Sequence, residues 1–302
     1  MKEVIPLKTF FHVLLIFLTL FILSNGSLVL AASSKALILW FEALLPSMFV
    51  SMVFIKWLVA IDAFSLLLKP LNTFTKFLFK LDSQAFSLVL VGSLIGFPAF
   101  AMMIDELIQK GELNQEAGQR LIYCVSCASC SFILITLGSL YFQSLKIGII
   151  LYIIQLLTIF ILLIFTRNNA VEFTNSHHPF IFKAFTSALL SSIKTMVMIV
   201  GYLMISLSLV SLLLLILPQG LHTALYTLAE FSSGTINLAT SSFATQEKYM
   251  LISGLLSFAG FSVHLQVMGS CEHTSLNYLT YLNYRLIQSI LAVILSFIIF
   301  IL

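Results

Sequence analysis

The stretch SLIGFPA, residues 93–99, interrupts an apolar segment that otherwise runs from Ala85 to Ile104. Glycine and proline at this point predict a broken helix, because proline lacks the N–H group that a helix needs. Unpaired backbone groups are not tolerated in hydrocarbon, so a membrane span breaks only where protein or water receives them. The segment therefore predicts a break of functional importance inside a membrane helix.

The composition of the whole chain agrees with a lipid environment. Of its 302 residues, 60% are hydrophobic and only 9% are charged, whereas soluble domains average about 25% charged residues. This composition excludes an ordinary soluble enzyme and a disordered chain, and the net charge of +3 indicates no nucleic-acid partner. Because a helical span needs about 20 apolar residues, roughly seven to nine spans fit. We expect an all-α polytopic protein of the cell membrane, including broken or re-entrant helices.

A second stretch resembles the first. The sequence SFAGFSV begins at residue 257, which is 164 positions after the start of SLIGFPA. Each copy continues into a polar hairpin and then an apolar segment entered at an arginine, Arg120 in the first copy and Arg285 in the second. Matched interruptions in two halves are typical of transporter binding sites. The pattern predicts two related halves, and chance similarity between leucine-rich helices is the alternative.

The segments divide the chain into four parts. We expect an N-terminal span at residues 1–35, a first repeat half at 36–166, a linker at 167–183 and a second repeat half at 184–302. Within the first half, the lysine-bearing stretch 56–80 predicts an interfacial helix. The charged stretch from Asp105 to Arg120 predicts a water-exposed helical hairpin.

Four motifs, in order along the chain, resemble the nucleoside-recognition (Gate) family and, within it, the YlbJ-like sporulation integral membrane proteins. They are WFEALLPS at 40–47, GFPAFA at 96–101, LAEFSSG at 228–234 and GFSVHLQ at 260–266. The resemblance implies a membrane transporter related to the one that exports dipicolinate from the mother cell toward the forespore. It also implies distant kinship with Gate proteins that handle nucleosides or ferrous iron.

Glu42 and Pro46 form the first candidate pair for a binding site. Counted from Ala36 at 1.5 Å per residue, Glu42 lies about 10 Å inside its span. A carboxylate at that depth usually faces a cavity or a partner. Pro46 also frees the carbonyl of Glu42, since proline cannot donate the i+4 hydrogen bond. The pair indicates a proton-coupling or cation-coupling site, and a structural ion pair with a lysine is the alternative.

The alternation of Ser262, His264 and Gln266 with apolar residues gives the second candidate group. If the chain is unwound after Gly260, these three side chains would lie in a row on one side. Glu230 and Gly234 belong to a polar segment that predicts either a re-entrant half-helix or a surface loop. The predicted substrate-binding residues are Glu42, Pro46, Gly96, Pro98, Glu230, Gly234, Gly260, Ser262, His264 and Gln266.

Other features indicate no chemistry. Cys124, Cys127 and Cys130 recur every three residues among serines and alanines. This pattern favours close helix packing over a metal site. Lys194 either lies inside its span or extends to the interface. With no Walker loop, HExxH or GxSxG motif, we expect no enzymatic activity, no catalytic residues, no resident metal and no cofactor.

The sequence therefore favours a secondary transporter of a small anionic or heterocyclic metabolite, with dipicolinate as the cargo that the resemblance implies. The expected partners are that small-molecule substrate and the lipid bilayer, and assembly into a homo-oligomer stays open. Two alternatives remain. One is a non-transporting membrane scaffold or spore-maturation factor, and the other is a nucleoside or metal-ion permease.

Overall fold

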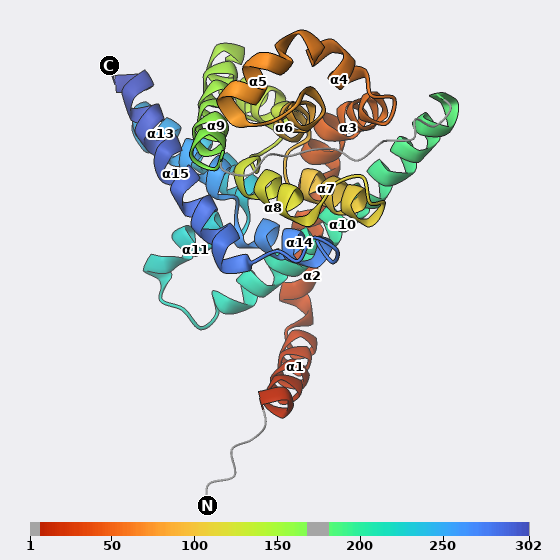
Figure 1. Ribbon diagram of the computed structural model, residues 1–302. Coiled ribbons are helices and arrows are strands. Elements are labelled where there is room, and N and C mark those ends of the chain that lie inside the picture. The colour runs from red at the N-terminus through yellow and green to blue at the C-terminus, as the bar shows by residue number, and fades with distance from the viewer. Residues whose placement is uncertain (1–6, 168–180, 302) are drawn as a thin grey trace, which may run out of the picture.

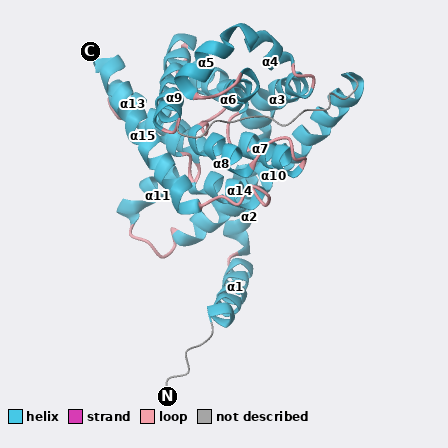
Figure 2. Ribbon diagram, in the orientation of Figure 1, coloured by secondary structure: helices cyan, strands magenta, loops and turns pink. Residues whose placement is uncertain are grey.

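The computed structural model describes residues 7–167 and 181–301 (Figure 1). Helices and the loops between them make up the described ranges (Figure 2). The N-terminal elements are α1 (Leu7–Ser24), α2 (Gly26–Leu39), the π-helical turn η1 (Trp40–Leu44), α3 (Leu45–Ala60), α4 (Ala63–Leu68), η2 (Lys69–Leu71), α5 (Asn72–Phe79), α6 (Ser83–Ile95), α7 (Ala99–Gln109), α8 (Gln115–Cys124), the π-helical η3 (Phe132–Tyr141) and α9 (Leu145–Phe165). The C-terminal elements are α10 (Ile181–Leu213), η4 (Gln219–Leu221), α11 (His222–Ala229), α12 (Phe231–Thr240), α13 (Thr245–Phe258), α14 (Phe261–Ser270) and α15 (Tyr278–Ile301).

Long apolar helices form the frame of the molecule. Within the described ranges, five stretches are long and apolar enough to cross a membrane: Gly26–Ala60, Leu145–Phe165, Ile181–Leu213, Thr245–Ser270 and Tyr278–Phe300. The all-α membrane fold is thus confirmed. The total of seven to nine spans stays a prediction. It would have to include shorter apolar helices such as α6, which is only about 20 Å long at 1.5 Å per residue.

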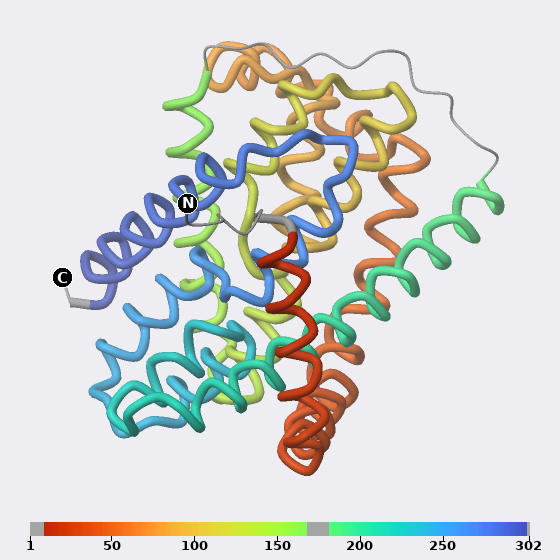
Figure 3. Tube along the Cα trace, turned by 90° about the horizontal axis from the view of Figure 1, so that it is seen from below, coloured from red at the N-terminus to blue at the C-terminus, as the bar shows by residue number. Residues whose placement is uncertain are grey.

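Two groups of long helices enclose the broken ones. The helix α10 packs along α2 and α3, and α15 packs along α13 and α9, as Figure 3 shows along the Cα trace. Between these groups lie α6, α7, α8 and α14, whose apolar side chains form one continuous buried core. By contrast, α1 projects away from the bundle (Figure 1), and most of its large apolar side chains are exposed.

The predicted boundaries agree only in part with the helices. The boundary after residue 35 falls inside α2, and the second half, expected from residue 184, begins inside α10. Most of the predicted linker lies outside the described residues. The lysine-bearing stretch forms the short helices α4 and α5, and their interfacial position stays a prediction. Lys56 at its start belongs to α3 and is buried.

The hairpin of α7 and α8 is less exposed than the sequence predicted. Its tip is in solvent, but Asp105 and Arg120 are only 6% and 7% exposed. The Asp105 carboxylate accepts hydrogen bonds from the backbone N–H of His273 at 2.9 Å and of Thr274 at 2.8 Å. These bonds attach the α7–α8 hairpin to the turn between α14 and α15, so Asp105 is a structural contact, whereas Lys110 and Glu116 are exposed as predicted.

Candidate functional site

Four helix breaks of the described chain meet at one place. They separate α6 from α7, α8 from η3, α11 from α12, and α13 from α14. The backbone N–H of Phe97 donates to the carbonyl of Cys127 at 2.9 Å, and that of Ala128 donates to Leu256 at 3.3 Å. The rings of Phe97 and Phe231 lie 5.0 Å apart between centroids. Contacts therefore connect each break directly to at least one other.

Glycine permits this close approach at two of the breaks. Gly96 has φ +69°, and a Cβ atom there would lie 2.3 Å from the backbone nitrogen of Ser129. A Cβ on Gly260 would lie 2.8 Å from the backbone nitrogen of Phe231. Both neighbours are backbone atoms, so they cannot turn aside as a flexible side chain would. The two predicted interruptions are thus contact points between segments distant in sequence.

Arg285 donates hydrogen bonds to backbone carbonyls that have no helical partner at the breaks. This side chain in α15 is fully buried, and its guanidinium donates to the carbonyls of Tyr123 and Ser126, where α8 ends. It also donates to the carbonyl of Ser257, near the end of α13, at 3.4 Å. Unpaired carbonyls are costly away from water. Arg285 therefore makes it possible for two helices to stop inside the bundle.

Glu230 is the acidic residue at the place where the four helix breaks meet. It begins α12, is 2% exposed, and its carboxylate accepts from the backbone N–H groups of Ser232 at 3.1 Å and Ser233 at 2.6 Å. A carboxylate in this position is stabilised by the helix N-terminus. Glu230 is therefore a buried acid held by its own helix, which favours the re-entrant half-helix over the surface loop.

A cavity of about 20 Å³ lies beside Glu230, with Pro98, Ser232 and Gln266 in its wall. This volume holds about one water molecule. Within the described residues, Gln266 Oε1 and Ser232 Oγ are buried and have no hydrogen-bond partner. Buried polar atoms normally have one. Beside the cavity there are thus an amide oxygen that can accept, and a hydroxyl that can donate or accept, a hydrogen bond from a water molecule or a ligand group.

The predicted row of Ser262, His264 and Gln266 does not form. The chain resumes a regular helix at Phe261, so residues two apart point in different directions. Gln266 donates to Ser262 Oγ at 3.1 Å along one face. On another face, His264 packs against the ring of Phe258, with the centroids 4.9 Å apart.

Glu42 and Pro46 also lie away from the place where the four helix breaks meet. Both residues are exposed, whereas Leu44 and Met48 of the same stretch line the small cavity. The missing N–H of Pro46 has a visible effect, since the π-helical turn is closed by Leu45 N–H donating to the carbonyl of Trp40. The predicted pair therefore shapes the helix next to the site without facing it.

The remaining predicted residues have packing positions. A Cβ on Gly234 would lie 2.4 Å from the carbonyl oxygen of Thr227, so this glycine brings α12 close to α11. Cys127 lies in the non-helical segment between α8 and η3 and is fully buried. In the described part of the chain, no group of three His, Cys, Asp or Glu side chains is placed to hold a metal ion.

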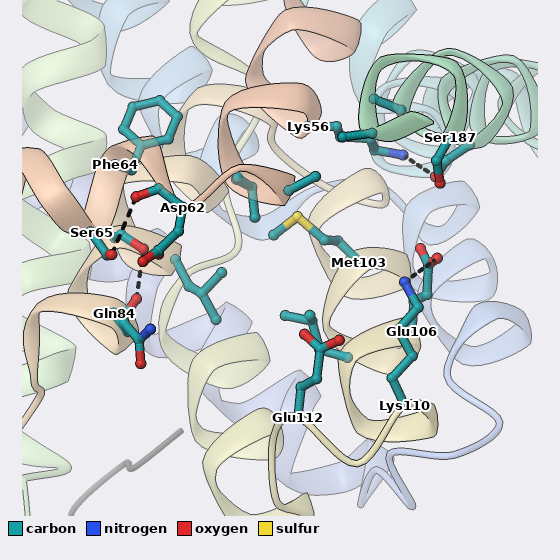
Figure 4. A pocket seen from close by; sticks show the side chains of 18 residues that line it. Lys56, Asp62, Phe64, Ser65, Gln84, Met103, Glu106, Lys110, Glu112 and Ser187 are labelled. Carbon is teal, nitrogen blue, oxygen red and sulfur yellow. Dashed lines mark hydrogen bonds and ion pairs between the residues drawn. The ribbon is translucent and has the colours of Figure 1, made fainter. Parts of the chain in front are cut away.

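A larger cavity, of about 400 Å³, lies between α3, α4, α6, α7 and α10 (Figure 4). Its wall includes Lys56, which the sequence places among the interfacial lysines. One feature of the sequence could have indicated that Lys56 is buried, because it follows directly on an apolar run that begins near Ala36. In the structure it lies four residues before the end of α3. Only the packing of α10 on α3 decides between a buried and an interfacial side chain.

Comparisons with known proteins agree with the membrane fold and with part of the resemblance. The chain is 22% identical to the sporulation integral membrane protein YlbJ of Bacillus subtilis, over 92% of this chain and 79% of that protein. No family model and no solved structure matches the chain, so the Gate domain stays a prediction. The chain is a multi-pass integral membrane protein distantly homologous to YlbJ.

Proposed function

We propose that this protein is a secondary transporter of a small anionic or heterocyclic metabolite. The observation that carries the proposal is the meeting of four helix breaks around Glu230, Gln266 and Ser232, where Gln266 Oε1 and Ser232 Oγ have no hydrogen-bond partner among the described residues. Discontinuous helices at the centre of a bundle supply backbone dipoles and allow one part to move against another. A purely structural bundle has no need of such costly interruptions.

The backbone at two of the breaks supports an origin from two related halves. Gly96, at the end of α6, has φ +69° and ψ −179°, and Ala259, at the end of α13, has φ +70° and ψ −175°. In each case a short helix, a loop and another helix follow. This geometry pairs Gly96 with Ala259 rather than with Gly260, a register one residue away from the sequence alignment.

Glu230 is our candidate for the coupling group. Transport against a gradient needs a group whose protonation or ion occupancy differs between two conformations. Glu230 is buried and lines the same small cavity as Gln266. A proton or a cation bound there would change the charge at the point where the four breaks meet.

Flux through proteoliposomes tests the proposal. We expect purified protein to move labelled dipicolinate, the cargo that the resemblance implies. We expect Glu230→Gln to lower the initial rate by about ten-fold, because a charge-assisted hydrogen bond contributes roughly 1.5 kcal/mol or more. The control is Glu247→Gln, since Glu247 also caps a helix but is exposed. Equal rates in liposomes with and without protein, for dipicolinate and for a nucleoside, would favour the scaffold.

A further inference from the structure

The 400 Å³ cavity has the size of a small-molecule site and uses none of the residues predicted from the sequence. Its apolar wall includes Leu88, Met103 and Ala188, which are all buried. Its polar wall includes Lys56 together with the hydroxyl groups of Ser187 and Ser191. The helices α6 and α7 border both this cavity and the Gly96 break.

Among the described residues of this wall, Lys56 is the one charged group that is buried. Lys56 is only 7% exposed. Its Nζ atom donates to Ser191 Oγ at 2.9 Å and to Thr195 Oγ1 at 3.0 Å. Among the residues that the structure describes, no carboxylate lies within 4.0 Å of Nζ. Hydroxyl groups orient an ammonium group but do not neutralise it, and a buried charge without a counter-charge is costly.

The acidic residues of the cavity supply only part of that counter-charge, because Glu106 acts on Lys56 from beyond ion-pair distance. Glu106 pairs with Lys110 at 3.0 Å, and the two side chains are 43% and 52% exposed. Asp62 and Glu112 are partly exposed, so water can solvate them. Figure 4 shows Asp62 across the cavity from Lys56 and Glu112 well below it. A negative charge that balances the Lys56 ammonium group would therefore have to lie at the end of the cavity next to Lys56.

We propose that this cavity binds a small carboxylate, whose anionic group completes the coordination of Lys56. An ammonium group has three N–H donors, and the two contacts to Ser191 and Thr195 leave one for a ligand. The apolar wall formed by Leu88 and Met103 suits an aromatic or aliphatic body. The site deepens the proposed transport function and rests on it, because it assigns a place where cargo is held.

Binding to the full chain in lipid nanodiscs tests this site. The probes are radiolabelled isophthalate and its neutral diamide, isophthalamide, which share one ring and one substitution pattern. The variants are Lys56→Met and Lys194→Met. Both lysines lie in candidate spans, but Lys194 is exposed. Lys56→Met keeps an unbranched side chain and removes a buried charge, a change that proteins often tolerate.

We expect the wild-type protein to prefer isophthalate to the diamide. Lys56→Met should weaken isophthalate binding by at least about thirty-fold, the usual effect of removing one partner of a buried charge pair. Lys194→Met should bind as the wild-type protein does. A Lys56→Arg variant, which keeps the charge, should retain the preference for isophthalate even if its affinity falls.

Three results would overturn the site: no isophthalate binding to the wild-type protein, equal binding of the diamide, or equal affinity in Lys56→Met. Failure of the site and failure of the transport proposal are distinguishable. Dipicolinate flux that does not depend on Lys56 would remove the site and keep the transporter. Binding that depends on Lys56, without flux of any carboxylate, would keep the site and remove the transporter.

Discussion

Replacing Gly96 by alanine gives a quantitative test of how the helix breaks fit together. The combination φ +69°, ψ −179° at Gly96 belongs to a region that only glycine adopts readily, at a cost of about 1–3 kcal/mol for other residues. The added Cβ would also lie 2.3 Å from the nitrogen of Ser129. Moving that backbone adds about 1–3 kcal/mol. We therefore expect a loss of roughly 2–6 kcal/mol in the free energy of unfolding.

Two other glycines separate the contributions. Gly111 has φ +72° but open space around its Cβ position, so Gly111→Ala should cost only about 1 kcal/mol. Gly201 lies within α10 with nothing within 4 Å of that position, so Gly201→Ala should stabilise by up to about 1 kcal/mol. Unfolding by SDS in mixed micelles, followed by tryptophan fluorescence, gives the three values. Gly96→Ala and Gly111→Ala with equal stability would refute the close contact at this break.

Three further substitutions test other parts of the account by the same unfolding assay. Ala259→Gly should stabilise by about 1 kcal/mol, because relief of strain at φ +70° exceeds the added chain entropy, and a loss of stability would contradict that backbone geometry. Arg285→Met should cost about 3 kcal/mol or more by leaving buried carbonyls unpaired, against almost no change for the exposed Arg167→Met. Asp105→Asn should cost about 2 kcal/mol by weakening the cap on the turn before α15, whereas the neighbouring Glu106→Gln loses only a surface pair and should stay within about 0.5 kcal/mol.

The sequence could predict those breaks that glycine or proline produces. Both the Gly96 and the Gly260 interruptions are present, because the chemistry that ends the helix is local. The break after α8 has no such residue, since the segment around Cys127 contains only serine, alanine, valine and cysteine. Arg285, far away in the chain, accounts for that break by donating to its carbonyls. A local pattern cannot indicate a contact of this kind.

The orientation of side chains was harder to predict than the position of breaks. The row of Ser262, His264 and Gln266 required an unwound segment, but α14 restarts one residue after Gly260. Glu42 was expected in a cavity from its depth in the span, yet depth does not decide which face of the helix packs inward. The burial of Lys56 depends likewise on α10, so neither side chain could be placed from its own neighbours in sequence.

Cysteine accessibility at Ser232 and Gln266 tests the central claim most directly. Each residue would be changed to cysteine in a chain whose native cysteines are replaced by serine, and labelled with a membrane-impermeant maleimide from either side of the membrane. If the four breaks form an alternating-access site, labelling should occur, and addition of a transported carboxylate should change its rate. Complete protection from both sides, with and without that carboxylate, would mean that the breaks enclose only packed side chains and would contradict the account.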